Sequence, residues 1–212
     1  MTTDRRLALI AGLLYLITHV TSVGAVVAYG SALDDPTASS ATRLALGAAL
    51  EFALALACLG TGVVLLPLLR RGAPVAATAF AAMRTMEAAV IAAGIIPVLT
   101  VMWLVKNQSD AVAGLGDGLA AAHDAAFLVG QGLIISINTF VLAFAQWKSA
   151  IVPVGIPVLG ALGAALVLSS NLMQLFGAIP LSGAVAGALA LPIFAFEIWF
   201  ALYLVFKGVR PR

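Results

Sequence analysis

Six long apolar runs follow one another along the chain, and short polar stretches separate them. A helix needs about 20 consecutive apolar residues to cross the hydrocarbon core of a bilayer. We therefore expect an all-α fold, one transmembrane bundle over residues 1–212 with six helices spanning approximately 7–30, 44–69, 75–105, 119–147, 154–177 and 183–206. The first run is longer than a signal-peptide core of about 7 to 15 residues, so we expect it to remain as a span.

The composition excludes the soluble classes of protein. Hydrophobic residues make up 63% of the 212-residue chain and charged residues only 9%, and the mean hydropathy is +1.12. Soluble domains are roughly a quarter charged, so the expected partner is the lipid bilayer. The single cysteine, Cys58, falls inside a span, which predicts no disulfide framework.

Basic residues gather on one side of the six-span arrangement. Short cytoplasmic loops carry an excess of Lys and Arg, which predicts cytoplasmic termini and a location in the cell inner membrane. That side holds Arg5, Arg6, Arg70, Arg71, Lys148, Lys207, Arg210 and Arg212, against Arg43 and Lys106 on the other side. The formal net charge of +2 comes from this rim. Any inner-membrane protein would carry such a rim, so it does not indicate a nucleic acid as partner.

Seven ionisable residues fall inside the spans. Each full charge near the bilayer centre costs about 2.5 to 3.5 kcal/mol on insertion scales, so such residues normally face the bundle interior and find partners there. The seven residues are His19, Glu51, Arg84, Glu87, His123, Asp124 and Glu197. Their number is larger than anchoring requires and indicates a polar interior.

The spacing of polar residues supports a shared interior face. Residues three, four and seven apart lie on one side of a helix. This spacing joins Tyr15, Thr18, His19 and Ser22 in the first span, Asp124, Gln131 and Asn138 in the fourth, and Asn171 and Gln174 in the fifth. We predict an internal pocket, biased toward the extracytoplasmic half, whose ligand-binding residues are Tyr15, His19, Gln131, Asn138, Asn171 and Gln174.

The charges inside the spans do not balance, because one arginine stands against four carboxylates. Arg84 can pair with Glu87 one turn away, or with Glu197 at the same depth. We favour Arg84 with Glu197 as a structural ion pair. Carboxylic acids kept protonated by burial suit proton transfer to an apolar substrate. The catalytic candidates are therefore Glu51, Glu87, His123 and Asp124, with assistance from His19.

A metal is the less favoured alternative for this interior. Two histidines and a carboxylate can hold zinc with an open position. However, the chain contains no HxxxH or HExxH spacing, and its two histidines lie on different predicted helices. The sequence therefore requires no cofactor.

Two further patterns concern helix packing. Gly183 and Gly187 form a GxxxG pair, which predicts a close helix contact. The first and fourth spans each carry a histidine, and the third and sixth each carry a glutamate and a proline. Two inverted halves of three helices, as in many transporters, would produce such a correspondence, but the residue-level match between the halves is poor.

Several stretches resemble a bacterial family of small six-helix membrane proteins known as domain of unknown function 4386. They include AGLLYLITHVTS, FAAMRTMEAAVIAAG, AAHDAAFLVGQG and LPIFAFEIWFALYLVFKG, and the R-x-x-E and H-D pairs are the most specific features among them. The resemblance implies the fold and the membrane location. It brings no catalytic residues with it.

Three functions remain open from the sequence. The leading hypothesis is a membrane-embedded pocket for a small or lipophilic ligand, with acid-base chemistry by buried carboxylates. A proton-linked transporter would use the same carboxylates as a relay. A scaffold would use the polar layers only to specify how the helices pack.

Overall fold

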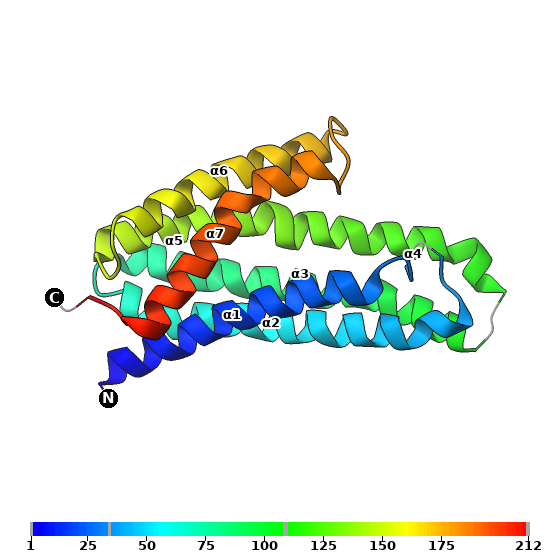
Figure 1. The fold of residues 1–212 in the computed structure, drawn as a ribbon, viewed down its shortest axis with the longest axis horizontal. Coiled ribbons are helices and arrows are strands. Elements are labelled where there is room, and N and C mark those ends of the chain that lie inside the picture. The colour runs from blue at the N-terminus through cyan, green and yellow to red at the C-terminus, as the bar shows by residue number, and fades with distance from the viewer. Residues whose placement is uncertain (1, 34, 108–109, 211–212) are drawn as a thin grey trace.

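The structure is a computed structural model that describes residues 2–33, 35–107 and 110–210, and it is helical throughout (Figure 1). The elements are α1 (Thr3–Tyr29), η1 (Ala38–Ser40), α2 (Ala41–Leu69), α3 (Pro74–Lys106), α4 (Ala111–Phe127), η2 (Leu128–Ile134), α5 (Ile135–Ser149), α6 (Gly155–Leu175) and α7 (Ala184–Phe206). The segment η2 is a π-helical stretch that joins α4 and α5 without a break. No strand occurs within the described ranges.

In the part of the chain that the structure describes, six helices are long and apolar enough to cross a membrane, which confirms the predicted all-α, six-span fold. The fourth of these runs through α4, η2 and α5 over Gly114–Ser149 and so begins earlier than expected. The placement of the termini at the cytoplasmic face stays a prediction. Of the basic residues behind it, Arg212 lies outside the described residues.

The helices close into a ring around a polar interior. Each of the six spans packs against the next one along the chain, and α7 returns to pack against α1. The approach of α1 to α7 is close, because a Cβ at Gly12 would lie 2.7 Å from the carbonyl oxygen of Ala201. Tyr15 continues this contact edge-on to Phe200, with ring centroids 5.4 Å apart.

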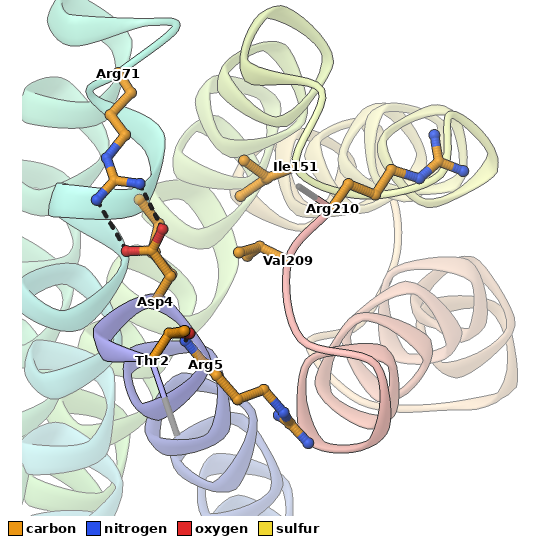
Figure 2. Close-up of a pocket in the computed structure, with 8 residues that line it drawn as sticks. Thr2, Asp4, Arg5, Arg71, Ile151, Val209 and Arg210 are labelled. Atoms are coloured by element: carbon orange, nitrogen blue, oxygen red, sulfur yellow. Dashed lines mark hydrogen bonds and ion pairs between the residues drawn. The ribbon is translucent and has the colours of Figure 1, made fainter. Parts of the chain in front are cut away.

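Interactions between distant parts of the chain close the basic end of the ring. The Arg5 side chain donates to the carbonyls of Leu204 and Val205 at 2.9 and 2.6 Å, in the last turn of α7, where carbonyls lack helical partners of the regular kind. Arg71 donates to Asp4 through two bonds of 2.5 and 2.9 Å. Figure 2 shows this pair beside a hollow of about 480 Å³, while the Arg210 side chain points away from the hollow. Arg5 and Arg71 therefore hold helix ends together at this side of the bundle.

The opposite half of the molecule is more open. In Figure 1 the hairpin of α6 and α7, drawn in gold and orange, stands apart from the outer ends of α1 and α4. Contacts between α1 and α7 extend as far as the edge-on packing of His19 on Phe194. Beyond this point Val26 and Val27 on α1 and Leu191 on α7 are exposed. The predicted GxxxG contact is wrong within the chain, because no atom of another helix lies within 4 Å of a Cβ placed on Gly187.

Gly12→Val should destabilise the protein by about 1 to 3 kcal/mol, because the added carbons would force α1 away from α7. Thermal unfolding of the purified protein in detergent would measure the change as a lower midpoint temperature. Gly187→Val is the matched control, since its side chain meets open space, and its midpoint should be unchanged. Equal effects of the two substitutions would contradict the tight contact between α1 and α7.

The predicted orientation can be tested by cysteine labelling, because the one native cysteine, Cys58, is buried. Ser182→Cys, between α6 and α7, should react with a membrane-impermeant maleimide in intact cells. Lys207→Cys, at the basic end, should react only after permeabilisation. The reverse pattern would place the basic end outside the cell and overturn the cytoplasmic assignment of the termini.

Candidate functional site

A cavity of about 170 Å³ lies inside the ring. Its walls come from α1, α2, α3, the η2–α5 segment and α7, so five of the six spans contribute to it. The lining residues are Thr18, His19, Ser22, Val23, Leu54, Cys58, Arg84, Glu87, Gln131, Ile135, Phe194 and Glu197. The polar face predicted for the first span does border this interior.

The deep wall of the cavity holds an ion pair. Arg84, whose exposed fraction is 1%, donates from Nη1 to both carboxylate oxygens of Glu87 at 2.9 Å. Its Nε donates to the Thr61 hydroxyl on α2 at 3.0 Å. The guanidinium carbon also lies 5.2 and 5.9 Å from the ring centroids of Tyr15 and Phe80, a distance at which an aromatic face attracts a cation.

Glu87 is surrounded by donors. In addition to Arg84, the Asn138 amide on α5 donates to one of its oxygens, and the Cys58 thiol on α2 lies 3.7 Å from the other. This donor set matches a carboxylate anion. Glu87 therefore joins α2, α3 and α5, and each of its two oxygens already has two partners within the protein.

The expected pairing of Arg84 with Glu197 is corrected by the structure. Glu87 holds the arginine, and Glu197 on α7 instead faces His19 on α1, with Oε2 and Nε2 3.6 Å apart. Arg84 and Glu87 lie three residues apart on one helix, a spacing at which side chains are neighbours. Glu197 comes from α7, and the charged group nearest to it is His19.

His19 has a defined tautomer in this arrangement. Its Nδ1 lies 2.9 Å from the Tyr15 carbonyl oxygen, and a carbonyl can only accept a hydrogen bond. Nδ1 therefore carries a proton, and Nε2 is the nitrogen that faces Glu197. The ring packs edge-on against Phe194 with centroids 4.6 Å apart.

A second pair of the same construction lies beside a smaller hollow. His123 Nδ1 lies 3.0 Å from the Gly94 carbonyl oxygen, and its Nε2 lies 3.5 Å from Glu51. Tyr29 donates its hydroxyl to the other oxygen of Glu51 at 2.9 Å. The hollow has a volume of about 10 Å³, which is close to the smallest space that accommodates one water.

Gln131 connects the two hollows. It lies in the π-helical segment, lines both spaces, and accepts a hydrogen bond from Ser22 at 3.2 Å. Single π-helical turns inside α-helices occur frequently at functional sites. The neighbouring Gly132 lets Asn171 on α6 approach, because a Cβ there would lie 2.5 Å from the Asn171 side-chain oxygen.

The other predicted site residues lie elsewhere. Asp124 occupies an exposed position on α4 and borders neither hollow. Asn171 and Gln174 hydrogen-bond within α6, to the Val167 carbonyl and the Ser170 hydroxyl. The spacing predicted Asp124, Gln131 and Asn138 on one face, but the wider π-helical turn between them shifts that phase.

Sequence reasoning missed two residues of this interior. Tyr29 follows Tyr15 and Ser22 at intervals of seven residues, so an extended count of the first polar face would have found it. Thr61 is three residues from Cys58 on α2 and completely buried. Among the described residues, no group of three or more His, Cys, Asp and Glu side chains is placed to hold a metal ion.

Comparison with known families adds one match. A family model described as a domain of unknown function, DUF4386, matches residues 10–208. The chain belongs to this family. The resemblance seen in the sequence is thus confirmed, and it covers nearly the whole bundle of this DUF4386 protein. No curated protein and no solved structure matches the chain.

Replacing Arg84 by Met in this DUF4386 protein should cost about 3 to 5 kcal/mol of stability, because Glu87 would become a buried charge without its counter-ion. The double variant with Glu87→Gln should recover much of that loss. Thermal unfolding of the single and double variants would measure the coupling.

Arg71→Met is the control for that measurement. It breaks the exposed pair with Asp4 and should cost less than about 1 kcal/mol. Strictly additive effects at positions 84 and 87 would contradict the assignment of their pair as the structural centre of the interior.

Proposed function

We propose that this DUF4386 protein binds a small or lipophilic ligand in the cavity between α1, α2, α3 and α7, and that the ligand arrives from the membrane. One observation supports this most directly. The deep wall of the cavity is charged, while two apolar residues on its lining, Val23 on α1 and Phe194 on α7, are 53% and 45% exposed. The polar interior is thus bordered by side chains that face lipid.

The size of the cavity suits the polar part of such a ligand. A volume of about 170 Å³ corresponds to roughly five or six waters, at about 30 Å³ each in the liquid. A head group of that size fits inside, and a longer apolar tail would have to lie outside. Val20 and Val27 on α1 and Leu191 on α7 offer exposed apolar surface for such a tail.

For acid-base chemistry in this cavity, His19 and Glu197 are the best placed pair. Both line the cavity, and His19 directs its Nε2 at the carboxylate. The sequence candidates fit less well, because Glu87 is already surrounded by donors and Asp124 is exposed. Glu51 and His123 border only the smaller hollow.

Proton-linked transport is a second candidate, supported by a different observation. The pair of His19 with Glu197 and the pair of His123 with Glu51 both adjoin hollows that Gln131 lines. Together they provide a series of proton-accepting groups through the interior. Transport also requires the basic end, closed by Arg5 and by the pair of Arg71 with Asp4, to open.

The binding proposal predicts that a bulky side chain in the cavity displaces the ligand. Ser22→Trp should remove any lipophilic molecule that copurifies with the protein, because Ser22 lines the cavity. Native mass spectrometry of protein released from a mild detergent would detect the bound mass. Ile10→Trp is the matched control, since Ile10 is exposed on the same helix and lies toward the basic end, away from the cavity.

The two variants should have similar thermal midpoints, so that loss of the bound mass reports on the cavity. Retention of the same adduct in Ser22→Trp would count against the cavity as the binding site. If neither the wild-type protein nor Ile10→Trp carries any adduct, the protein in lipid nanodiscs would be titrated with lipophilic probes, and failure of every probe to bind would overturn the proposal.

A further inference from the structure

The two carboxylates of the cavity differ in what surrounds them. Glu87 accepts hydrogen bonds from Arg84 and Asn138 and lies within reach of the Cys58 thiol. Glu197 is 8% exposed, lines the cavity, and has His19 as its ion-pair partner at 3.6 Å. That distance is longer than a hydrogen bond. Glu197 is therefore the carboxylate that a ligand in the cavity would meet.

The charge balance around Glu197 involves every helix that borders the cavity. The polar and titratable groups around the cavity, besides Glu197 on α7, are Tyr15 and His19 from α1, Cys58 from α2, Arg84 and Glu87 from α3, and Gln131 from η2. Arg84 and Glu87 cancel each other. The cavity is then neutral only when Glu197 and His19 together hold one proton beyond the proton on His19 Nδ1. That proton resides either on the Glu197 carboxylate or on His19 Nε2.

The positive charge on the cavity wall is already balanced. Arg84 is the permanent cation among its lining residues, and its Nε and Nη1 are engaged by Thr61 and Glu87. The rings of Tyr15 and Phe80 flank the guanidinium. The lining thus presents one underpaired carboxylate, and beside it the partly exposed ring of Phe194, which can attract a cation.

We propose that the ligand is a lipophilic cation, such as an ammonium group that carries an apolar tail, and that its head exchanges at Glu197 for the one proton that balances the charge of Glu197 and His19. This inference rests on the proposed binding function and names the chemistry of the same cavity. When the cation enters, Glu197 remains as the carboxylate and His19 as the neutral imidazole. One proton leaves to water, so the net charge of the cavity is unchanged.

A permanently charged probe tests the exchange, because it has no proton of its own to release. Purified protein in lipid nanodiscs would be titrated with dodecyltrimethylammonium in weak buffer containing a pH indicator. Binding should release one proton per bound cation. On the acid side, where the site holds its proton, the affinity should fall tenfold for each unit decrease in pH, because cation and proton compete for one position.

Two probes that carry the same tail serve as comparisons: dodecanol is uncharged and dodecanoate is an anion. Dodecanol and dodecanoate should bind at least tenfold more weakly than the cation and should release no proton from this site. If dodecanol or dodecanoate binds as well as the cation, the inference about a cation is overturned while the proposed pocket stands. If no probe binds at any pH, the proposed function itself fails.

Substitutions of Glu197 test whether the exchange of cation for proton takes place at this residue. Glu197→Gln should lose both cation binding and proton release, and Glu197→Asp should restore at least part of each. Asp117→Asn, an exposed acidic position on α4, should behave as the wild-type protein. Should Glu197→Gln fail to fold, proton release by the wild-type protein still decides the question, since binding without release overturns the exchange.

Discussion

An arginine with 1% of its surface exposed inside an apolar bundle must receive compensation from several directions, because a buried charge without a partner is strongly destabilising. Arg84 receives it from Glu87 on its own helix, from the Thr61 hydroxyl on α2 and from the Tyr15 ring on α1. Glu87 then fixes the position of Asn138 on α5. Four helices are in this way oriented by one pair of charges, and the cavity is the space that remains beside them.

The two ends of the bundle differ in how firmly they are held. At the basic end, Arg5 donates to carbonyls at the end of α7, and Gly12 allows α1 and α7 to come into backbone contact. In the other half, the tip of the α6–α7 hairpin is exposed on nearly all sides. The cavity lies between these regions. If the cavity binds a ligand as proposed, the more open half is the side from which that ligand would enter.

The hydrophobic pattern predicted the fold well, because span length and polarity are properties of single helices. The face of α1 that carries His19 was predictable for the same reason. The pairing of charged side chains between helices was not predictable, since it depends on the order of the helices around the ring and on the rotation of each helix about its axis. Glu197 therefore met His19 instead of Arg84. Asp124 was misplaced because counting by sevens assumes an unbroken α-helix, whereas a π-helical segment follows it.

The location of each charge pair along the chain also has a consequence for the order of assembly. Arg84 and Glu87 lie three residues apart on one helix, so their charges balance within α3. This helix can therefore enter the bilayer before its neighbours are in place. His19 and Glu197 belong to the first and the last membrane helix. During synthesis, α1 must therefore reside in the membrane with an incomplete polar face until the ribosome has delivered α7. The cavity is therefore complete only after α7 has joined the bundle.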